Sequence, residues 1–491
     1  MPRANQNVTP LDQRRRLIVG IFMAVLAVVA LRDAARLGNA LPWRTMDDFP
    51  DFYCAGAVLN QRASPYNYEP LRTCEHRVNV GNTYRAKLFA SNPGVAVPAP
   101  LPPYDFVPFM VLARLPFADA RLIDALAIVV AVSLCVVALA GLEVPIDVAA
   151  AALVLSTGFV ELNTGQIVPF ALLALVSCGF FLARGPHWLA GIAATLTAIE
   201  PTVGVPVVAA TLLFVPRARS AVVVTGFVVA LTAFAMVGVH ELTKYLTSVL
   251  PAQAGSELRF PFEYSLAYAL AFLGASPEVA RFAGAFSYLV LLAIGLWFAP
   301  RTSRALGRPE LLVFLPAFCA VIAGPYIHAE ELCFALPALL TMAVATQGRV
   351  RAACAISVCV LSIPWILVWG MKQLFVASIF VSAVVLVRLR INALTASAGL
   401  VAIAALLYLL ELRPPHLPVP EHALQRVYAP SDLVQAEWRD YTQQRATHDA
   451  LWFDIKIPTW AALLGGLAIA ACYSLLWPIR CQPVGSKAPD A

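Results

Sequence analysis

Three aspartates stand close together just after the first apolar segment of the chain. Asp47, Asp48 and Asp51 open the stretch MDDFPDFYCAGAVLNQRASPYN, residues 46–67. A carboxylate beside a packed helix at a membrane surface can act as a general base, because it takes a proton from a hydroxyl within hydrogen-bond reach. Ionisable residues at the ends of apolar segments also occur as plain interfacial charges. The residue types alone leave both interpretations open.

Three further groups of polar residues interrupt apolar stretches. They are the segment 161–166 with Asn163 and Gln166, the pair Glu200-Pro201, and the segment 325–331 with the sequence PYIHAEE. A charged side chain at bilayer depth is costly unless it is paired or hydrated. If the three interruptions lie at the same membrane face as the aspartates, a shared polar cavity explains them better than three separate interfacial turns do.

Composition places the chain among membrane proteins. Of its 491 residues, 60% are hydrophobic and 13% are charged, whereas soluble proteins have about 25% charged residues. The net charge of +6 comes largely from short basic loops, which the positive-inside rule explains without a nucleic-acid partner. The run 18–30 has no clear small-residue cleavage site, so we interpret it as a membrane anchor and not as a signal peptide.

The apolar segments predict an all-α polytopic bundle of about 12–14 transmembrane helices. Several segments are shorter than the roughly 20 residues that a straight span needs, so we expect tilted, broken or paired helices among them. The predicted spans are 17–37, 121–141, 147–161, 167–183, 187–199, 202–215, 220–239, 282–299, 309–325, 332–347, 352–369, 373–387, 393–411 and 457–478.

Loop charge gives the orientation. Arg14, Arg15 and Arg16 precede the first span, so the N-terminal tail 1–16 is predicted to be cytoplasmic. Alternation from there puts every short basic loop on the same side. The predicted cytoplasmic residues are Arg184, Arg217, Arg219, Arg301, Arg304, Arg308, Arg349, Arg351, Arg388, Arg390 and Arg480.

The long loops then fall on the extracytoplasmic face. The predicted organisation is a membrane region 17–411 with a first outer loop 38–120, an outer loop 412–456, a last span 457–478 and a cytoplasmic tail 479–491. We expect a short helix over 105–115 lying along the membrane and a polar helix over 431–451. Long outer loops around a helical bundle indicate that the protein works on that face.

Most of the ten cysteines lie in apolar spans, and none has a CxxC or Cys/His metal spacing. Cys54 and Cys74 differ, because both map to the oxidising side of the membrane, where a disulfide persists. Sequence does not fix the Cα separation that a disulfide needs, so the pairing stays open.

These residues resemble glycosyltransferase family 87, a polytopic group of the GT-C superfamily, over about residues 46–345. The matching motifs follow the family's order: Asp48-Phe49, Ala55-Gly56, Pro65-Tyr66, Leu101-Pro102-Pro103-Tyr104, Asn163-Thr164-Gly165-Gln166, Ala190-Gly191, Glu200-Pro201, Gly324-Pro325 and His328. Two positions depart from the pattern. The family has glycine before the tyrosine of the first motif, and it has lysine where this chain has Glu200, which reverses the charge there.

The resemblance implies a GT-C-like fold and sugar transfer from a polyprenyl-phosphate donor, typically carrying mannose, to a lipid or glycan hydroxyl at the outer face of a bacterial inner membrane. It implies Asp48 as the catalytic base, with Asp51 as the alternate, and His328 as the phosphate-binding residue. The alternatives to His328 for the phosphate are cations of the first loop that no motif places: Arg72, Arg77, Arg85 and Lys87. The side chains expected to line the site are Tyr53, Asn163, Gln166, Glu200, Tyr326, Glu330 and Glu331.

A divalent metal stays open, but no metal or other cofactor is predicted, because no DxD-like acidic pair has a clear partner. Two functions of other classes also fit the sequence. A secondary transporter would place polar residues on broken helices, as at Glu200-Pro201. A lipid-translocating protein would use the same groove without a base.

Overall fold

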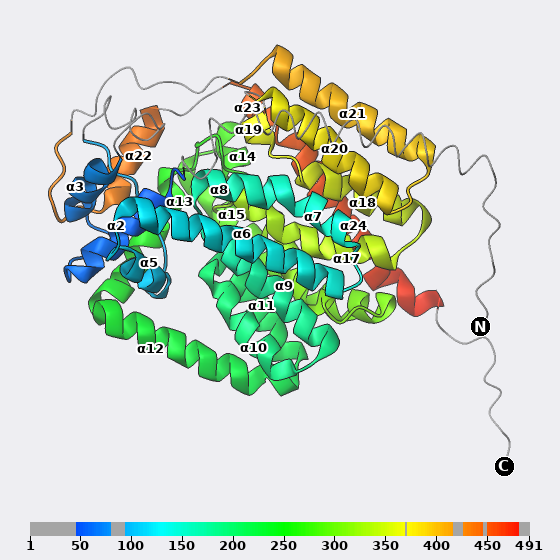
Figure 1. The fold of residues 1–491 in the computed structure, drawn as a ribbon, viewed down its shortest axis with the longest axis horizontal. Helices are drawn as coiled ribbons and strands as arrows, with labels where there is room; N and C mark the ends of the chain where they lie inside the picture. The colour runs from blue at the N-terminus through cyan, green and yellow to red at the C-terminus, as the bar shows by residue number, and fades with distance from the viewer. Residues whose placement is uncertain (1–45, 80–93, 369–370, 416–425, 445–448, 481–491) are drawn as a thin grey trace.

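The computed structural model describes residues 46–79, 94–368, 371–415, 426–444 and 449–480 (Figure 1). Every element of the described chain is a helix, as predicted, and the protein is an all-α polytopic membrane protein. The predicted tail 1–16, the first span 17–37, residues 481–491 of the predicted C-terminal tail, Arg85 and Lys87 lie outside the described residues.

Six helical segments of the described chain are long and apolar enough to cross a membrane. Their large outward-facing apolar surface suits lipid acyl chains; in the apolar window of 216–256, 11% of the residues are buried. The helices in these segments are α6 (Phe117–Gly141), α7 (Ile146–Leu153) with η4 (Val154–Phe159) and α8 (Val160–Thr164), α12 (Arg219–Lys244) with η6 (Pro216–Ala218), η7 (Tyr245–Val249) and α13 (Leu250–Ser256), α15 (Pro277–Leu306), α21 (Ala393–Leu412), and α23 (Leu451–Asp454) with α24 (Ile457–Arg480).

The other helices of the bundle are shorter. They are α9 (Val168–Arg184), α10 (His187–Leu196), η5 (Thr197–Ile199), α11 (Pro201–Phe214), α14 (Leu266–Phe272), α16 (Leu311–Ala320), η8 (Glu330–Ala335), α17 (Leu336–Ala345), α18 (Gly348–Leu361), α19 (Trp365–Val368) and α20 (Lys372–Arg388). Two predicted spans are broken: 309–325 is helical as far as Ala320, and 352–369 is interrupted after Leu361. Non-helical backbone at membrane depth is tolerated where protein buries it or a cavity takes it up.

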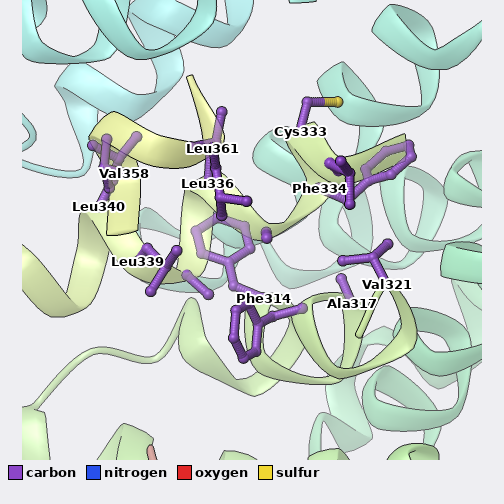
Figure 2. Packing of buried hydrophobic residues seen from close by; sticks show 14 of the residues in the cluster. Phe314, Ala317, Val321, Cys333, Phe334, Leu336, Leu339, Leu340, Val358 and Leu361 are labelled. Atoms are coloured by element: carbon purple, nitrogen blue, oxygen red, sulfur yellow. The ribbon is translucent and has the colours of Figure 1, made fainter. Parts of the chain in front are cut away.

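The core is built by close packing of α16, η8, α17 and α18 around fully buried Phe314 and Phe334 (Figure 2). Because lipid tails are as apolar as leucine, packing and close backbone approach hold such helices together. Gly295 of α15 shows this, since a Cβ there would lie 3.0 Å from the Cα of Pro316 on α16.

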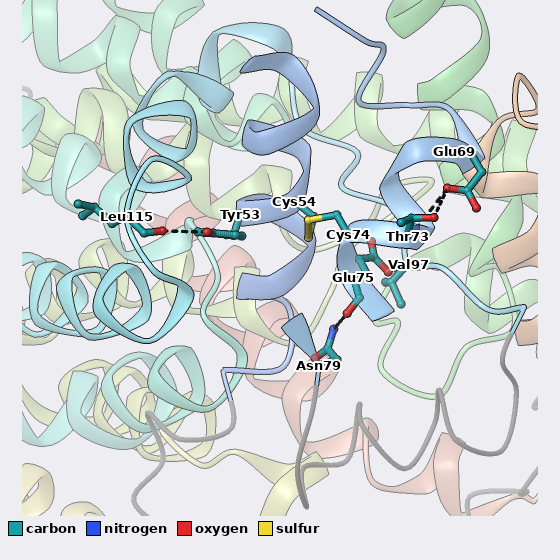
Figure 3. Close-up of a disulfide and its surroundings, with 9 residues drawn as sticks. All are labelled: Tyr53, Cys54, Glu69, Thr73, Cys74, Glu75, Asn79, Val97 and Leu115. Carbon is teal, nitrogen blue, oxygen red and sulfur yellow. Dashed lines mark hydrogen bonds between the residues drawn. A yellow bond between two sulfur atoms is a disulfide. The ribbon is translucent and has the colours of Figure 1, made fainter. Parts of the chain in front are cut away.

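A second layer, which we call the cap, covers one end of the bundle. It consists of α2 (Phe49–Asn60), α3 (Tyr68–Val78), the extended segment 94–102, η3 (Pro103–Asp105), α5 (Phe106–Leu112) and α22 (Val434–Gln444) (Figure 1). The helices expected over 105–115 and 431–451 are thus present as α5 and as the shorter α22. A disulfide joins Cys54 of α2 to Cys74 of α3 (Figure 3).

Buried carboxylates tie the cap together across long sequence distances. The backbone N–H of Val97 donates to Glu75 Oε2 at 2.9 Å, and the N–H of Ala96 donates to Glu437 Oε2 at 3.0 Å. Asn67 and Leu433 form an isolated antiparallel bridge. The first loop and the loop after α21 therefore fold as one layer.

The arginines of the basic loops gather at the other end of the bundle. Arg184, at the C-terminal end of α9, donates to the carbonyl of Gly141, and Arg308 pairs with Glu143 at 2.7 Å. Arg388 pairs with Asp147. That this end faces the cytoplasm stays a prediction from the loop charges.

Candidate functional site

A cavity of about 730 Å³ lies where the cap meets the bundle. Nine of the ten side chains expected at the site line it: Asp48, Asp51, Asn163, Gln166, Glu200, Tyr326, His328, Glu330 and Glu331. Another part of its wall is apolar, with Val205, Leu250, Leu361, Ile363, Trp365 and Leu367. The polar interruptions that are far apart in sequence thus share one cavity.

Asp48 is positioned by the Asn-Thr-Gly-Gln motif. The backbone N–H of Asp48 donates to the carbonyl of Thr164 at 2.6 Å, and Gln166 Nε2 donates to Asp48 Oδ2 at 2.6 Å. Gly165 makes this approach feasible: its φ of +77° is left-handed, and a Cβ would lie 2.8 Å from that of Phe49. The motif therefore docks the start of α2 and orients the carboxylate.

Tyr53 does not line this cavity. Its hydroxyl donates to the carbonyl of Leu115 at 2.8 Å (Figure 3). Its ring packs edge-on against Phe117. Phe52, one residue earlier on α2, lines the cavity instead. Successive residues of a helix point about 100° apart, so neighbours on α2 face different surroundings.

A second group of polar residues lines the cavity around His328; we call it the His328 end and the residues around Asp48 the Asp48 end, as names for the two groups. His328 is held by a backbone bridge to Glu263, with the N–H of Tyr264 donating to the carbonyl of Ile327 at 2.7 Å. His328 Nε2 lies 2.5 Å from Glu257 Oε2 and 2.9 Å from Glu263 Oε1. Its Nδ1 lies 3.7 Å from Glu330 Oε2, and the ring stacks on Tyr326 at 4.7 Å.

The electrostatics of this end follow from burial among acids. Burial disfavours the charged imidazole, but Glu257 and Glu263 outweigh it and raise the pKa of His328 well above its usual range. Burial and the neighbouring charge of Glu200 raise the pKa of Glu331. Among the described residues that line the cavity, none is lysine or arginine, so His328 is the sole titratable cation there.

Sequence reasoning missed Glu257, Glu263 and Trp438. Both glutamates lie between α13 and α14, and Trp438 lies on α22, far along the chain. Trp438 Nε1 donates to Glu257 Oε1 at 2.6 Å. No motif or spacing marks these residues, because tertiary packing alone brings them to His328.

Residues 101–325 match the model of glycosyltransferase family 87. The match confirms the family resemblance. It indicates a membrane glycosyltransferase, which favours sugar transfer over the transporter and lipid-translocation alternatives. No curated protein and no solved structure matches the chain.

The region matched by the family model carries part of the site. It contains Asn163, Gln166 and Glu200, together with Glu257 and Glu263. Asp48 precedes it, and His328, Glu330 and Glu331 follow it. The structure brings these flanking residues against the matched region in one cavity.

Proposed function

We propose that the protein transfers a hexose, with mannose the first choice, from a polyprenyl-phosphate donor to an acceptor hydroxyl at the extracytoplasmic face of the cell membrane. The observation that carries the proposal is that Asp48 and His328 line the same cavity, together with an apolar wall. A lipid-linked sugar needs both surroundings, since its chain is apolar and its head group is polar.

Asp48 is the proposed base. An alcohol that attacks the anomeric carbon must lose a proton, and a carboxylate within hydrogen-bond reach takes it. Gln166 holds one carboxylate oxygen through a neutral amide, which orients Asp48 without adding charge. Asp51, buried one turn along α2, is the alternate.

His328 is proposed to serve the leaving phosphate. Developing negative charge on a leaving group is stabilised by donors or cations fixed near it. His328 is the titratable cation of the described lining, and it shares the cavity with Asp48. The donor sugar would therefore bind in this cavity, within reach of both side chains.

The test is sugar transfer from a polyprenyl-phosphate hexose by the purified full-length protein. General-base catalysis contributes about 10²–10⁴-fold, so Asp48→Asn should lower the rate at least 100-fold without changing expression or thermal stability. Asp51→Asn should be milder. Asp119→Asn, which changes an exposed aspartate at the start of α6, is the matched control and should transfer at the wild-type rate. Near-full transfer by both Asp48→Asn and Asp51→Asn would remove these residues from the reaction, with Glu330 or Glu331 next to be tested.

A further inference from the structure

The His328 end of the cavity carries more negative groups than positive ones. Five carboxyl groups surround this one imidazole: Glu200, Glu257, Glu263, Glu330 and Glu331. No described residue of the lining adds a lysine or an arginine. A phosphate entering this space adds further negative charge, and charges repel strongly where water is excluded. Phosphate binding here needs more positive charge than His328 supplies.

Three side chains at this end have their ligand atoms turned toward one another. Carboxylate oxygens of Glu257 and Glu263 and a ring nitrogen of His328 all lie within 4.8 Å of one another. One imidazole nitrogen with two carboxylate oxygens is a donor set that suits Mn²⁺ or Zn²⁺, whereas Mg²⁺ prefers oxygen ligands alone.

Each carboxylate accepts a hydrogen bond on the oxygen that does not face His328. Trp438 Nε1 donates to Glu257 Oε1 at 2.6 Å, which leaves Oε2 directed at His328. The backbone N–H of Ile327 donates to Glu263 Oε2 at 3.1 Å, which leaves Oε1 directed at the same nitrogen. Hydrogen bonds of this kind fix the orientation of metal ligands in proteins.

Glu263 Oε1 gives a separate indication of a bound group. The residue is 1% exposed, and its Oε1 lies 2.9 Å from the same His328 Nε2 that lies 2.5 Å from Glu257 Oε2. A single N–H on Nε2 cannot point at Glu257 and Glu263 together. A cation in place of that proton would face both carboxylate oxygens.

We propose that Glu257, Glu263 and His328 bind one divalent cation, Mn²⁺ or Zn²⁺, and that this cation holds the donor phosphate. When the cation binds, the Nε2 proton of His328 leaves to solvent and the nitrogen lone pair binds the metal, so the divalent cation supplies the positive charge toward phosphate in place of the protonated imidazole. The cation then acts as a Lewis acid on the phosphoryl oxygen as the sugar departs, with no change of oxidation state. The role toward phosphate rests on the proposed function, whereas the metal site does not.

Metal binding is tested on the full-length protein in detergent, without donor, after removal of metals with EDTA. A Mn²⁺ titration followed by electron paramagnetic resonance should show about one site per chain, and Zn²⁺ should compete for it. Glu257→Gln and Glu263→Gln should each weaken Mn²⁺ binding at least tenfold. Glu310→Gln is the control, because Glu310 is a buried glutamate beside Arg308 at the basic end of the bundle. It should bind Mn²⁺ as the wild type does.

Two outcomes would overturn the metal site. One is the absence of saturable Mn²⁺ or Zn²⁺ binding to the wild-type protein. The other is binding by the two glutamine variants with wild-type affinity, when thermal melting shows that they are folded. A Mn²⁺-induced rise of the wild-type melting temperature tests the site even if the variants do not fold.

The role toward phosphate has its own readout. The ³¹P signal of a short-chain polyprenyl phosphate should broaden when Mn²⁺ is bound, and Glu263→Gln should abolish the broadening. Mn²⁺ binding without ³¹P broadening would overturn the role toward phosphate, and the metal site itself would still be supported. Full sugar transfer in EDTA by a protein that binds no metal would overturn the site and leave the proposed function. Metal binding without any sugar transfer would overturn the proposed function and leave the metal site supported.

Discussion

The two polar ends of the cavity use the same chemical group in different surroundings. Asp48 is half-buried and its carboxylate is held by the neutral amide of Gln166. Glu257 and Glu263 are buried, and their carboxylates face an imidazole within 3 Å. A carboxylate near water exchanges protons readily, whereas buried carboxylates that converge on one point favour a cation. This difference in surroundings is why we propose the base at Asp48 and ion binding at Glu257 and Glu263.

The comparison predicts that the His328 end stabilises the fold and that the Asp48 end does not. Removing one partner of a buried ion pair leaves an uncompensated charge, which costs about 3–5 kcal/mol. His328→Ala should therefore lower the free energy of unfolding by about that amount, as measured by denaturant unfolding in detergent. Asp48→Asn should change it by less than about 0.5 kcal/mol, because asparagine keeps an oxygen that accepts from Gln166 Nε2.

Equal stability of His328→Ala and Asp48→Asn would contradict this view. It would mean that Glu257 and Glu263 take up protons once the imidazole is gone, so that no buried charge is left unpaired. The Mn²⁺ titration of His328→Ala then decides whether the site still binds the ion, and Glu310→Gln again serves as the control for a buried acid elsewhere.

The fold was predictable because its signals are local. Apolar runs and basic loops mark the spans, so α6, α9 and α15 fall where the hydropathy pattern puts them. The Asp48 end was also predictable in large part, because Asp48 and the segment 163–166 carry motifs of the family. Their docking by Gly165 was not, since it depends on a contact across more than 100 residues.

The acidic surroundings of His328 could not be predicted from the sequence. No motif links the two segments that supply Glu257, Glu263 and Trp438. A backbone bridge and the packing of α22 bring them together. Tyr53 shows a second limit. Its place beside Phe52 in the sequence says nothing about which of the two faces the cavity, because that depends on the rotation of α2 about its axis.

Removing the disulfide should affect the Asp48 end and not the His328 end. The bond holds α2 of the cap, which begins just after Asp48. The Cys54–Cys74 bond closes a loop of 20 residues, and bonds of this kind stabilise by about 2–4 kcal/mol. A Cys54→Ser, Cys74→Ser double variant should lose about that much stability and should transfer sugar more slowly. Mn²⁺ binding at the His328 end should stay unchanged.

Hydrogen exchange shows which helices lose stability in the double variant. Faster exchange should be confined to α2 and α3, with α16 and α17 as protected as in the wild type. Cys472→Ser is the matched control, since Cys472 is a free, exposed cysteine on α24. A double variant with wild-type melting and wild-type exchange in α2 would show that packing alone holds the cap.

Gln166 should affect the rate of the Asp48 end and leave donor binding unchanged. A hydrogen bond to a charged group contributes about 1.5–3 kcal/mol, and water replaces part of it at a half-buried site. Gln166→Ala should thus lower kcat about tenfold, with the KM for the donor near its wild-type value. Gln61→Ala, which removes an exposed glutamine after α2, should change neither constant. A rise in donor KM at constant kcat would place Gln166 on the donor and not on the base.

Tyr53→Phe should give the smallest effect on stability, and it tests which face of α2 lines the cavity. Tyr53→Phe removes one hydroxyl, the donor to the carbonyl of Leu115, and keeps the ring against Phe117. A neutral hydrogen bond contributes about 0.5–1.5 kcal/mol, so unfolding should become easier by about that amount while sugar transfer stays at the wild-type rate. Phe52→Ala should slow sugar transfer, because Phe52 lines the cavity. If Tyr53→Phe slowed transfer and Phe52→Ala did not, α2 would present its other face to the substrate, and Asp48 would have to reach the acceptor from a different side.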